Sequence, residues 1–348
     1  MSKIKHKHKF GKKSLLALAM SLTVTMGFSQ DNFYFSQYFQ VGPAINPAFT
    51  GIDNFLDVKI NYRNQWAGLG DSPSTNYLGV NGYIKKESTQ TYREYALRIS
   101  DPSILDSLSN IQTSLKDKIK HGIGGHVIYD RQGPFEQISG YFNYAIHIPI
   151  GFKTNLSIGV SASITNNRID LSKIVLGDKI NTDEFFQQLV AQGGKNTYLD
   201  INPGFAFYGE KWYISYAAFK ALRSSISSDE VLDYDNSIDH NILMGLRLNL
   251  SSNTKLLPSL YYNYNNNVNN LWETNVKVMF NEKPWFGVSY RNTKALIFMA
   301  GVYINNMFNV SYSYDYTLSN LSNYINGSHE VHFGLMLNKK DLKSPYLW

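Results

Sequence analysis

Apolar and polar residues alternate along most of the chain. In the stretch 308–316, every second residue is apolar or aromatic: Phe308, Val310, Tyr312, Tyr314 and Tyr316. The residues between them are polar: Asn309, Ser311, Ser313 and Asp315. Stretches 55–63 and 154–165 alternate in the same way. Because successive side chains of a strand point to opposite faces, each run predicts a β-strand with one apolar and one polar face.

Counting such runs predicts about fourteen strands of roughly 8–13 residues each. They lie near 55–63, 74–84, 121–130, 137–149, 154–165, 198–208, 211–219, 239–250, 255–264, 269–280, 284–291, 295–304, 307–316 and 328–337. A tilted strand of this length crosses a bilayer, and an even strand number is typical of bacterial outer-membrane barrels. The predicted fold class is all-β, with a single transmembrane antiparallel β-barrel over residues 55–338.

The lengths of the connections support a barrel. Bacterial barrels have short periplasmic turns and long outer loops in alternation. Five predicted inner connections are short: 150–153, 209–210, 251–254, 281–283 and 305–306. Three predicted outer connections are long and polar: 166–197, 220–238 and 317–327. The inner connection 85–120 breaks the rule, and its apolar residues from Ile104 to Ile119 recur at helical spacing, which predicts a periplasmic amphipathic helix.

Two further features bear on the fold. A large β-sandwich would also alternate, but its strands are usually shorter and its loop lengths need not alternate. Residues 30–54 do not resemble a barrel strand, because Pro43 and Pro47 remove ladder donors while several aromatic residues favour burial. We therefore expect this segment to plug the lumen or the periplasmic mouth.

The first 29 residues are typical of a secretory signal peptide. A basic region without acidic residues precedes the apolar stretch 15–28, and Gly27 and Ser29 supply small residues for cleavage. Six of the 33 basic residues lie in this region, so the remainder has 27 basic against 27 acidic residues. The balance argues against nucleic-acid binding. The chain has no cysteine, which excludes disulfides and a lipid anchor on cysteine.

Several segments in order along the chain resemble the PorP/SprF family of type IX secretion membrane proteins. They are YFSQYFQVGPAINPAFTGI (34–52), YRNQWAGL (62–69), IYDRQGPF (128–135), YAIHIPIG (144–151), WFGVSYRNTKAL (285–296) and SYSYDYTLSNLSNYINGSHEVHFGL (311–335). The resemblance implies an outer-membrane barrel of a Bacteroidetes-type bacterium. It also implies a role in secretion or surface attachment of partner proteins, often large adhesins, and in some members in gliding motility. The connection 85–120 and the tail 339–348 depart from the usual pattern.

Ten residues are candidate contacts with a partner or with the plug. They are Asn46, Pro47, Tyr62, Arg63, Trp66, Asp130, Tyr314, Asp315, His329 and Glu330. Two have a simpler interpretation: Arg63, on the polar face of the first strand, pairs with a lumen carboxylate, and Trp66 anchors at the membrane interface. For Glu330 and His332, on one face of the last strand, we favour a hydrogen-bond network in the lumen over a zinc site.

Signals for metals, cofactors and catalysis are weak, and we predict none of them. Asp233, Asp235, Ser237 and Asp239 place oxygen atoms at alternate positions of an outer loop, as calcium binding would need, but acidic surface loops are common. Gly122–Gly125 opens a strand and not a helix, so it is no phosphate loop. No Ser/His/Asp grouping stands out, and the chain is not expected to be an enzyme.

The preferred hypothesis is an outer-membrane accessory of the type IX secretion system. It would bind, export or anchor a secreted surface protein or its C-terminal domain, beside further secretion components and within the lipid bilayer. The main competing hypothesis is a pore or transporter for small or hydrophobic solutes, which needs an open lumen. A third hypothesis is a barrel enzyme such as a lipid hydrolase or protease, and a fourth is a purely structural surface protein.

Overall fold

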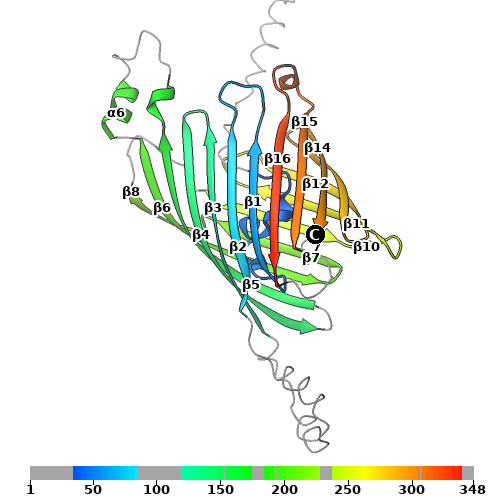
Figure 1. The fold of residues 1–348 in the computed structure, drawn as a ribbon. Helices are drawn as coiled ribbons and strands as arrows, with labels where there is room; N and C mark the ends of the chain where they lie inside the picture. Colours follow the sequence, from blue (N-terminus) through cyan, green and yellow to red (C-terminus); the bar gives the residue numbers. More distant parts are fainter. Residues whose placement is uncertain are drawn as a thin grey trace, which may run out of the picture. The chain divides into compact units, whose positions relative to one another are not determined.

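Strands dominate the computed structural model, which describes residues 34–84, 119–151, 154–174, 184–192, 194–227, 237–305 and 307–338. Sixteen strand segments form one antiparallel sheet (Figure 1). Their bounds are β1 Leu56–Asn64, β2 Ser74–Ile84, β3 Lys120–Gln132, β4 Phe135–Gly151, β5 Thr154–Ile169, β6 Lys195–Gly209, β7 Trp212–Phe219, β8 Leu222–Ser227, β9 Asp239–Leu246, β10 Leu248–Asn249, β11 Thr254–Tyr264, β12 Leu271–Phe280, β13 Pro284–Arg291, β14 Ala295–Ile304, β15 Phe308–Thr317 and β16 Ser328–Leu337.

Two pairs of these segments are single strands with an interruption. β7 and β8 both pair with β6, and they are separated at Lys220, whose φ is 58°. β9 and β10 both pair with β11, on either side of Arg247. The sheet therefore contains fourteen barrel strands, as the alternation predicts. It closes on itself because β1 pairs with β16 and β11 pairs with β9, which excludes a two-sheet sandwich.

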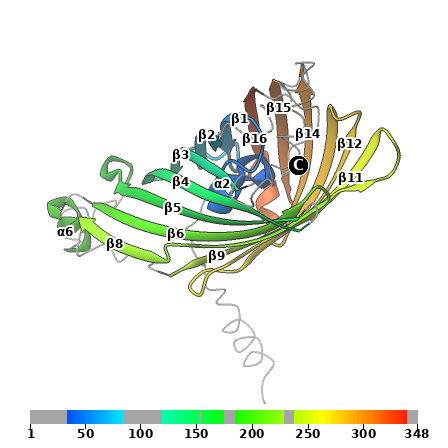
Figure 2. The same ribbon diagram turned by 90° about the horizontal axis from the view of Figure 1, so that it is seen from below.

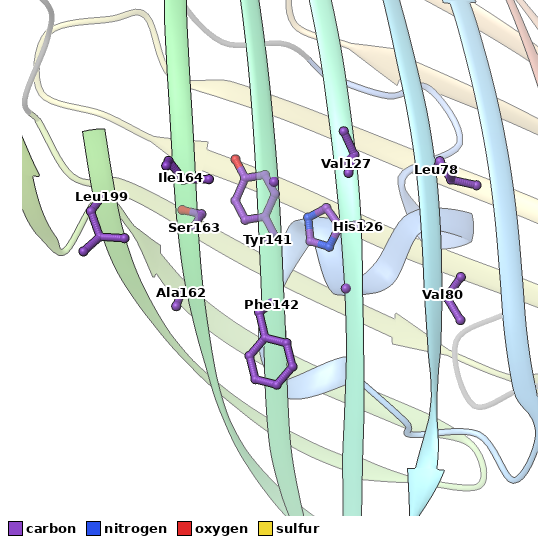
Figure 3. Close-up of a pocket in the computed structure, with 12 residues that line it drawn as sticks. Leu78, Val80, His126, Val127, Tyr141, Phe142, Ala162, Ser163, Ile164 and Leu199 are labelled. Atoms are coloured by element: carbon purple, nitrogen blue, oxygen red, sulfur yellow. The ribbon is translucent and has the colours of Figure 1, made fainter. Parts of the chain in front are cut away.

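The alternation decides which face of each strand points inward. In β15, Asn309, Ser311 and Asp315 are buried, whereas Val310 and Tyr312 are exposed. The exposed large apolar residues of the remaining strands share the outer face, as lipid contact requires. Figure 3 shows part of this wall, with Leu78, Val127 and further residues on neighbouring strands.

Two predicted outer loops are shorter than expected. β5 continues to Ile169 and β6 begins at Lys195, so only part of 166–197 is a connection, and it contains η3 (Leu171–Lys173) and α6 (Glu184–Gln192). β8 occupies part of the predicted loop 220–238 by pairing with β6. Backbone hydrogen bonds do not depend on side-chain polarity, so the ladder continues through polar residues beyond the apolar zone.

The two ends of the barrel differ in their connections. Five short turns lie at one end, including 281–283, where Asn281 and Glu282 have φ of 49° and 57°. Three longer connections lie at the opposite end: 65–73, 170–194 and 318–327, the last with η5 (Asn320–Asn323). The connection 85–119 between β2 and β3 is the exception expected from the sequence, because it is long and joins two strands at the end with the short turns. Because bacterial barrels have short periplasmic turns, the end with the long connections faces outward.

Several predictions lie outside the described residues: the signal peptide 1–29, the helix expected within 85–118, Asp233 and Asp235 of the acidic loop, and the tail 339–348. In the described part of the chain, no helix has the length and apolar character needed to cross a membrane.

Candidate functional site

Residues 34–54, which we call the lumen segment, lie inside the barrel (Figure 2). The segment contains three short turns of helix: η1 (Tyr38–Val41), α2 (Gly42–Ile45) and η2 (Pro47–Phe49). Every residue from 35 to 52 is buried. η2 lies against β4, β5, β6 and β7. The segment therefore occupies the interior of the barrel, in contact with the strands that surround it.

The outer part of the lumen holds a network of buried charges. We call Arg63, Glu273, Arg291, Asp315 and Glu330 the ionic cluster. Arg63 Nη2 lies 2.8 Å from Asp315 Oδ2, and Arg63 Nη1 lies 3.3 Å from Glu330 Oε2. Arg291 is 2.7 Å from Glu273 Oε2 and 3.1 Å from Asp315 Oδ2. All five side chains are at most 3% exposed, so loss of one partner leaves a buried charge uncompensated.

The lumen segment is bonded to this ionic cluster through two residues. The Ser36 hydroxyl accepts hydrogen bonds from Arg63 (2.7 Å) and Arg291 (3.0 Å) and donates to Asp315. The backbone N–H groups of Ser36 and Gln37 donate to the two carboxylate oxygens of Glu330, at 2.7 and 3.0 Å. Hydrogen bonds to charged groups are stronger than neutral ones. The ionic cluster thus fixes the outer end of the lumen segment.

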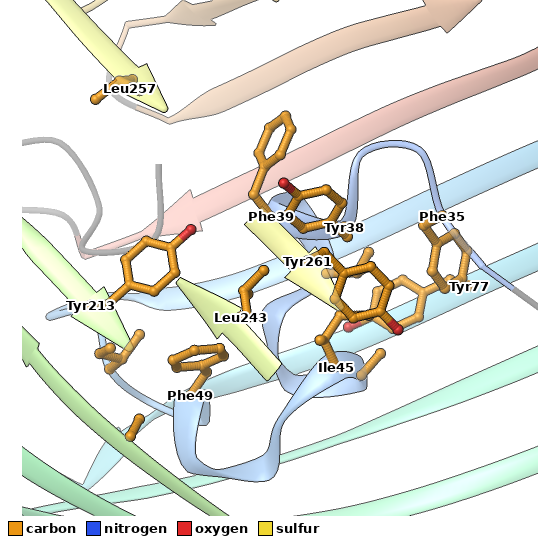
Figure 4. Packing of buried hydrophobic residues seen from close by; sticks show 14 of the residues in the cluster. Phe35, Tyr38, Phe39, Ile45, Phe49, Tyr77, Tyr213, Leu243, Leu257 and Tyr261 are labelled. Atoms are coloured by element: carbon orange, nitrogen blue, oxygen red, sulfur yellow. The ribbon is translucent and has the colours of Figure 1, made fainter. Parts of the chain in front are cut away.

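Aromatic packing fixes the middle of the segment (Figure 4). The Tyr38 ring stacks on Tyr261 of β11 at 5.3 Å between centroids, and Phe39 meets Trp285 of β13 edge to face at 5.6 Å. The Lys277 ammonium lies 3.9 Å from the centre of the Phe39 ring and 4.6 Å from that of Trp285. Both rings therefore offer the buried ammonium a cation–π contact.

Asn46 fixes the inner half of the segment to the barrel wall. Its side-chain oxygen accepts the N–H of Ala48 and so caps η2. Its amide nitrogen donates to two backbone carbonyls, those of Phe205 in β6 and Tyr216 in β7, both at 3.1 Å. One side chain thus orders the turn and links it to two strands.

Glycines in the wall let the backbone of the segment approach closely. A Cβ atom on Gly159 would lie 2.3 Å from the Ala48 nitrogen, and one on Gly122 would lie 2.0 Å from the Thr50 oxygen. Both positions face the lumen, and only a residue without a side chain fits there.

The connections 65–73 and 318–327 contact each other at the outer rim of the barrel. Both include residues of the segments on which the family resemblance rests. The Ala67 N–H donates to Gly327, and the Asn326 N–H donates to Ala67. The Trp66 N–H donates to the Ser328 hydroxyl at 3.0 Å. Large side chains are exposed beside this contact, with Tyr324 at 75% and Leu69 at 38%. We call Trp66, Leu69 and Tyr324 the rim patch.

The structure brings only some of the ten predicted residues together. Arg63, Asp315 and Glu330 meet in the ionic cluster. Asn46 and Pro47 belong to the inner half of the lumen segment, and Trp66 lies at the rim. Asp130 is buried apart from them and accepts hydrogen bonds from Thr75 (2.6 Å) and Gln132 (2.9 Å).

Three predicted residues point away from the lumen. Tyr62 is 45% exposed on the outer face of β1. Tyr314 and His329 also face outward, with ring centroids 5.3 Å apart, and the Tyr312 hydroxyl is 2.6 Å from His329 Nδ1. They cannot contact the lumen segment, and their place near the outer ends of their strands suits the aromatic belt of a barrel.

Sequence reasoning missed Ser36, Glu273 and Arg291. A signal was present for two of them, because Glu273 and Arg291 occupy the polar faces of predicted strands in the same way as Arg63. Ser36 carries no comparable signal, since only the folded segment places it between two arginines.

Among the described residues, no group of three or more His, Asp or Glu side chains is arranged to hold a metal ion. Several buried polar groups of the barrel wall form hydrogen bonds with the lumen segment, at Ser36, Gln37 and Asn46. The arrangement is one of binding and packing.

Residues 27–335 match the family of type IX secretion system membrane proteins PorP/SprF. The chain belongs to this family. It is accordingly a membrane protein of the type IX secretion system, and its closed antiparallel barrel with an apolar outer face is that of an outer-membrane protein.

Solved structures of outer-membrane barrels resemble this PorP/SprF protein in fold. The toluene transporter TbuX of Ralstonia pickettii has a TM-score of 0.46 and 8% identity, over 86% of this chain and 94% of that chain. The monoaromatic hydrocarbon channel CymD has the same TM-score and identity, over 88% and 94%. Omp33 of Acinetobacter baumannii has a TM-score of 0.39 and 9% identity, over 82% and 99%. No curated protein matches the sequence significantly.

Proposed function

We propose that this PorP/SprF protein binds a secreted surface protein, such as a large adhesin, and helps to export or anchor it at the outer membrane. The observation that carries the proposal is the occupied lumen. A solute channel needs an open path, whereas here residues 35–52 are buried and bonded to the wall. Membership in a secretion family favours a partner that is a protein.

The rim patch is the proposed binding site, or landing site, for the secreted partner protein. It lies at the end of the barrel that faces the cell exterior, next to the strands that carry Arg63 and Glu330 of the ionic cluster. An exposed tyrosine and an exposed leucine on ordered loops are suitable anchors for a protein interface, in which aromatic residues contribute much of the binding energy. The partner's C-terminal domain is the expected ligand, and further type IX components are expected nearby.

Affinity purification of the tagged protein from outer membranes in mild detergent tests the proposal. We expect one large secreted protein to co-purify in near-equal amount, and to be lost from the cell surface when the gene is deleted. Where that partner is a motility adhesin, gliding stops as well. Recovery of the barrel alone, with surface proteins unchanged after deletion, would contradict the proposal.

The landing site has its own test. Replacing Leu69 and Tyr324 together by alanine should weaken partner recovery by roughly tenfold or more, as loss of interface anchors does. The matched control replaces Leu222 and Tyr264, which are exposed on the opposite side of the ring of strands. Equal losses in both double variants would remove the rim patch from the proposal.

Planar-bilayer recording distinguishes the secretion accessory from a pore. The intact protein should show no steady conductance. Stable channels from the intact protein, together with solute uptake that depends on the gene, would favour a pore or transporter.

A further inference from the structure

The outer face of the wall carries an apolar hollow across β2 to β6 (Figure 3). Its volume is about 570 Å³. Its floor consists of outward positions with small side chains or none: Gly125, Gly140 and Ala162. These residues lie at neighbouring positions of β3, β4 and β5, since Val127 pairs with Gly140, and Phe142 pairs with both Gly125 and Ala162.

Large apolar side chains form the sides of the hollow. Leu78, Phe142 and Ile164 are 51%, 57% and 51% exposed, and Val127 and Leu199 also stand on its border. All of them face the lipid. A furrow of this kind in the membrane zone is shaped for hydrocarbon chains and not for water.

A row of charged residues lies above the hollow, toward the outer end of the same strands. Arg131 of β3 pairs with Glu136 of β4, Glu136 pairs with Arg168 of β5, and Arg168 pairs with Lys195 of β6. The four side chains face the lipid, as those of Val127, Ile164 and Leu199 in the hollow do. Each lies four positions along its strand from a residue of the hollow, and residues an even number of positions apart share a face. Three are basic and one is acidic, so the row is positive.

The spacing between the row and the hollow suits a lipid. Arg131 is four positions from Val127 along β3, which is roughly 13 Å at about 3.3 Å per residue. The outward residues between the hollow and the row are Tyr129, Ile138 and Asn166, so the row is the first charged level above the apolar zone on these strands. It therefore lies at the level of the outer headgroups, and the hollow lies at the level of the acyl chains.

We infer that this face of the barrel binds a phosphorylated lipid of the outer leaflet. Its acyl chains occupy the hollow over Gly125, Gly140 and Ala162, and its phosphate is bound by Arg131, Arg168 and Lys195. Glu136 is the register partner of both Arg131 and Arg168, so one acidic residue stands between the two arginines of the row. Arginine suits the phosphate because its planar guanidinium can donate two parallel hydrogen bonds.

Native mass spectrometry of the full-length protein in mild detergent tests the inference. The probes are bisphosphorylated lipid A and the same lipid freed of phosphate. We expect one molecule of the phosphorylated lipid to be retained, with a preference of roughly tenfold or more over the phosphate-free form, because each basic residue near an anionic lipid adds to the attraction.

Two sets of variants test the hollow and the basic row separately. Gly140→Leu fills the floor, and its Cβ meets only Ile164 Cγ2 at 3.9 Å, so the wall accepts it; it should reduce retention of both lipids. Arg131→Gln with Arg168→Gln should abolish the preference for phosphate. The controls are Ala300→Leu, on the lipid face of β14, and Lys283→Gln with Lys294→Gln, in turns away from the hollow.

Equal retention of both lipids by every variant would overturn the inference, because ordinary solvation by lipid tails would explain it. Inorganic phosphate that binds as tightly as the phosphorylated lipid would also contradict it, because the hollow would then contribute nothing to the affinity. A dimer of the chain that Gly140→Leu dissociates, with no lipid retained, would assign the hollow to a second copy instead.

Discussion

Among the residues of the barrel wall, Glu330 binds the lumen segment most directly. One carboxylate accepts the N–H groups of Ser36 and Gln37, the side-chain amide of Asn61 and the guanidinium of Arg63. Its neighbours in the cluster are charged and fully buried, so no water replaces a lost partner. An isolated carboxylate at this depth would be unstable, and the arginine and the N–H groups together offset its desolvation.

Glu330→Gln should therefore lower the free energy of unfolding by about 3 kcal/mol or more, since it leaves Arg63 short of a buried partner. Urea unfolding in lipid vesicles, followed by tryptophan fluorescence, measures the change. The control is Glu282→Gln, which removes a pair with Lys255 at a half-exposed turn and should cost less than about 1 kcal/mol. Similar losses in the two variants would show that the ionic cluster does not stabilise the fold.

Glycine at position 159 is required by the approach of Ala48. Gly159→Ala places a methyl group against backbone atoms that cannot rotate away, so we expect a cost of about 1–3 kcal/mol and a lower Tm. Gly140→Ala, on the lipid face of the neighbouring strand, should leave the Tm nearly unchanged because its Cβ makes only an ordinary contact with Ile164. A Gly159→Ala protein as stable as the control would mean that the lumen segment does not rest against β5.

At the scale of elements, the lumen segment and the barrel have different tasks. The strands satisfy their backbone groups with one another, so the barrel does not need the segment in order to close. The segment has no long helix of its own, and its short turns bury almost every side chain against the wall. Its conformation is therefore a consequence of the lumen around it.

Replacing residues 34–52 by a Gly/Ser linker of equal length should leave a folded barrel that conducts ions. The wall remains, whereas the side chains that fill the lumen are gone. Heat-dependent mobility on gels reports the folded barrel, and planar-bilayer recording reports the opening. A folded variant that stays closed would show that different residues block the lumen.

Cross-linking tests whether the segment leaves the lumen during function. The chain has no cysteine, so Gln37→Cys with Ser311→Cys introduces one defined pair of thiols, at side chains whose oxygens lie 2.5 Å apart. Both halves of the lumen segment are hydrogen-bonded to the barrel wall, so we expect it to stay in place. A short thiol cross-linker should therefore leave the amount of co-purified partner unchanged. Loss of recovery that reducing a cleavable linker restores would show that the segment must move.

At the scale of the whole molecule, closure of the barrel depends on pairing between strands from the two ends of the sequence. β1 and β16 pair over nine positions, from Leu56 with Leu337 to Asn64 with His329. This contact removes both sheet edges, which would otherwise expose unpaired backbone groups to lipid.

A disulfide between these two strands reports the closure. Tyr62 and Val331 are cross-strand partners on the lipid face, and paired strands place Cα atoms at about 4.5–5.5 Å, within the range that a disulfide spans. Tyr62→Cys with Val331→Cys should oxidise readily in the membrane. The offset control, Tyr62→Cys with Phe333→Cys, should oxidise much less. No difference between the two pairs would contradict the register.

The sequence by itself determined the strand number, the fold class and the family. Alternation with a period of two residues is a local property, so each strand indicates its own lipid face and lumen face. The connection lengths then distinguish the two ends of the barrel. Arg63, Asp315 and Glu330 were predictable as lumen groups for the same reason, although the pattern could not show that they meet. The proposed boundary at residue 29 and the partner remain predictions.

Only the tertiary structure decided how the lumen is occupied. Ser36 lies more than 250 residues from Arg291 and Asp315 along the chain, and no local pattern links positions so far apart. The path of the lumen segment depends on gaps that Gly122, Gly159 and Gly204 leave in three different strands. The hollow under the basic row arises in the same way, because strand register, and not sequence spacing, aligns Arg131 with Arg168 and Gly125 with Ala162 across β4.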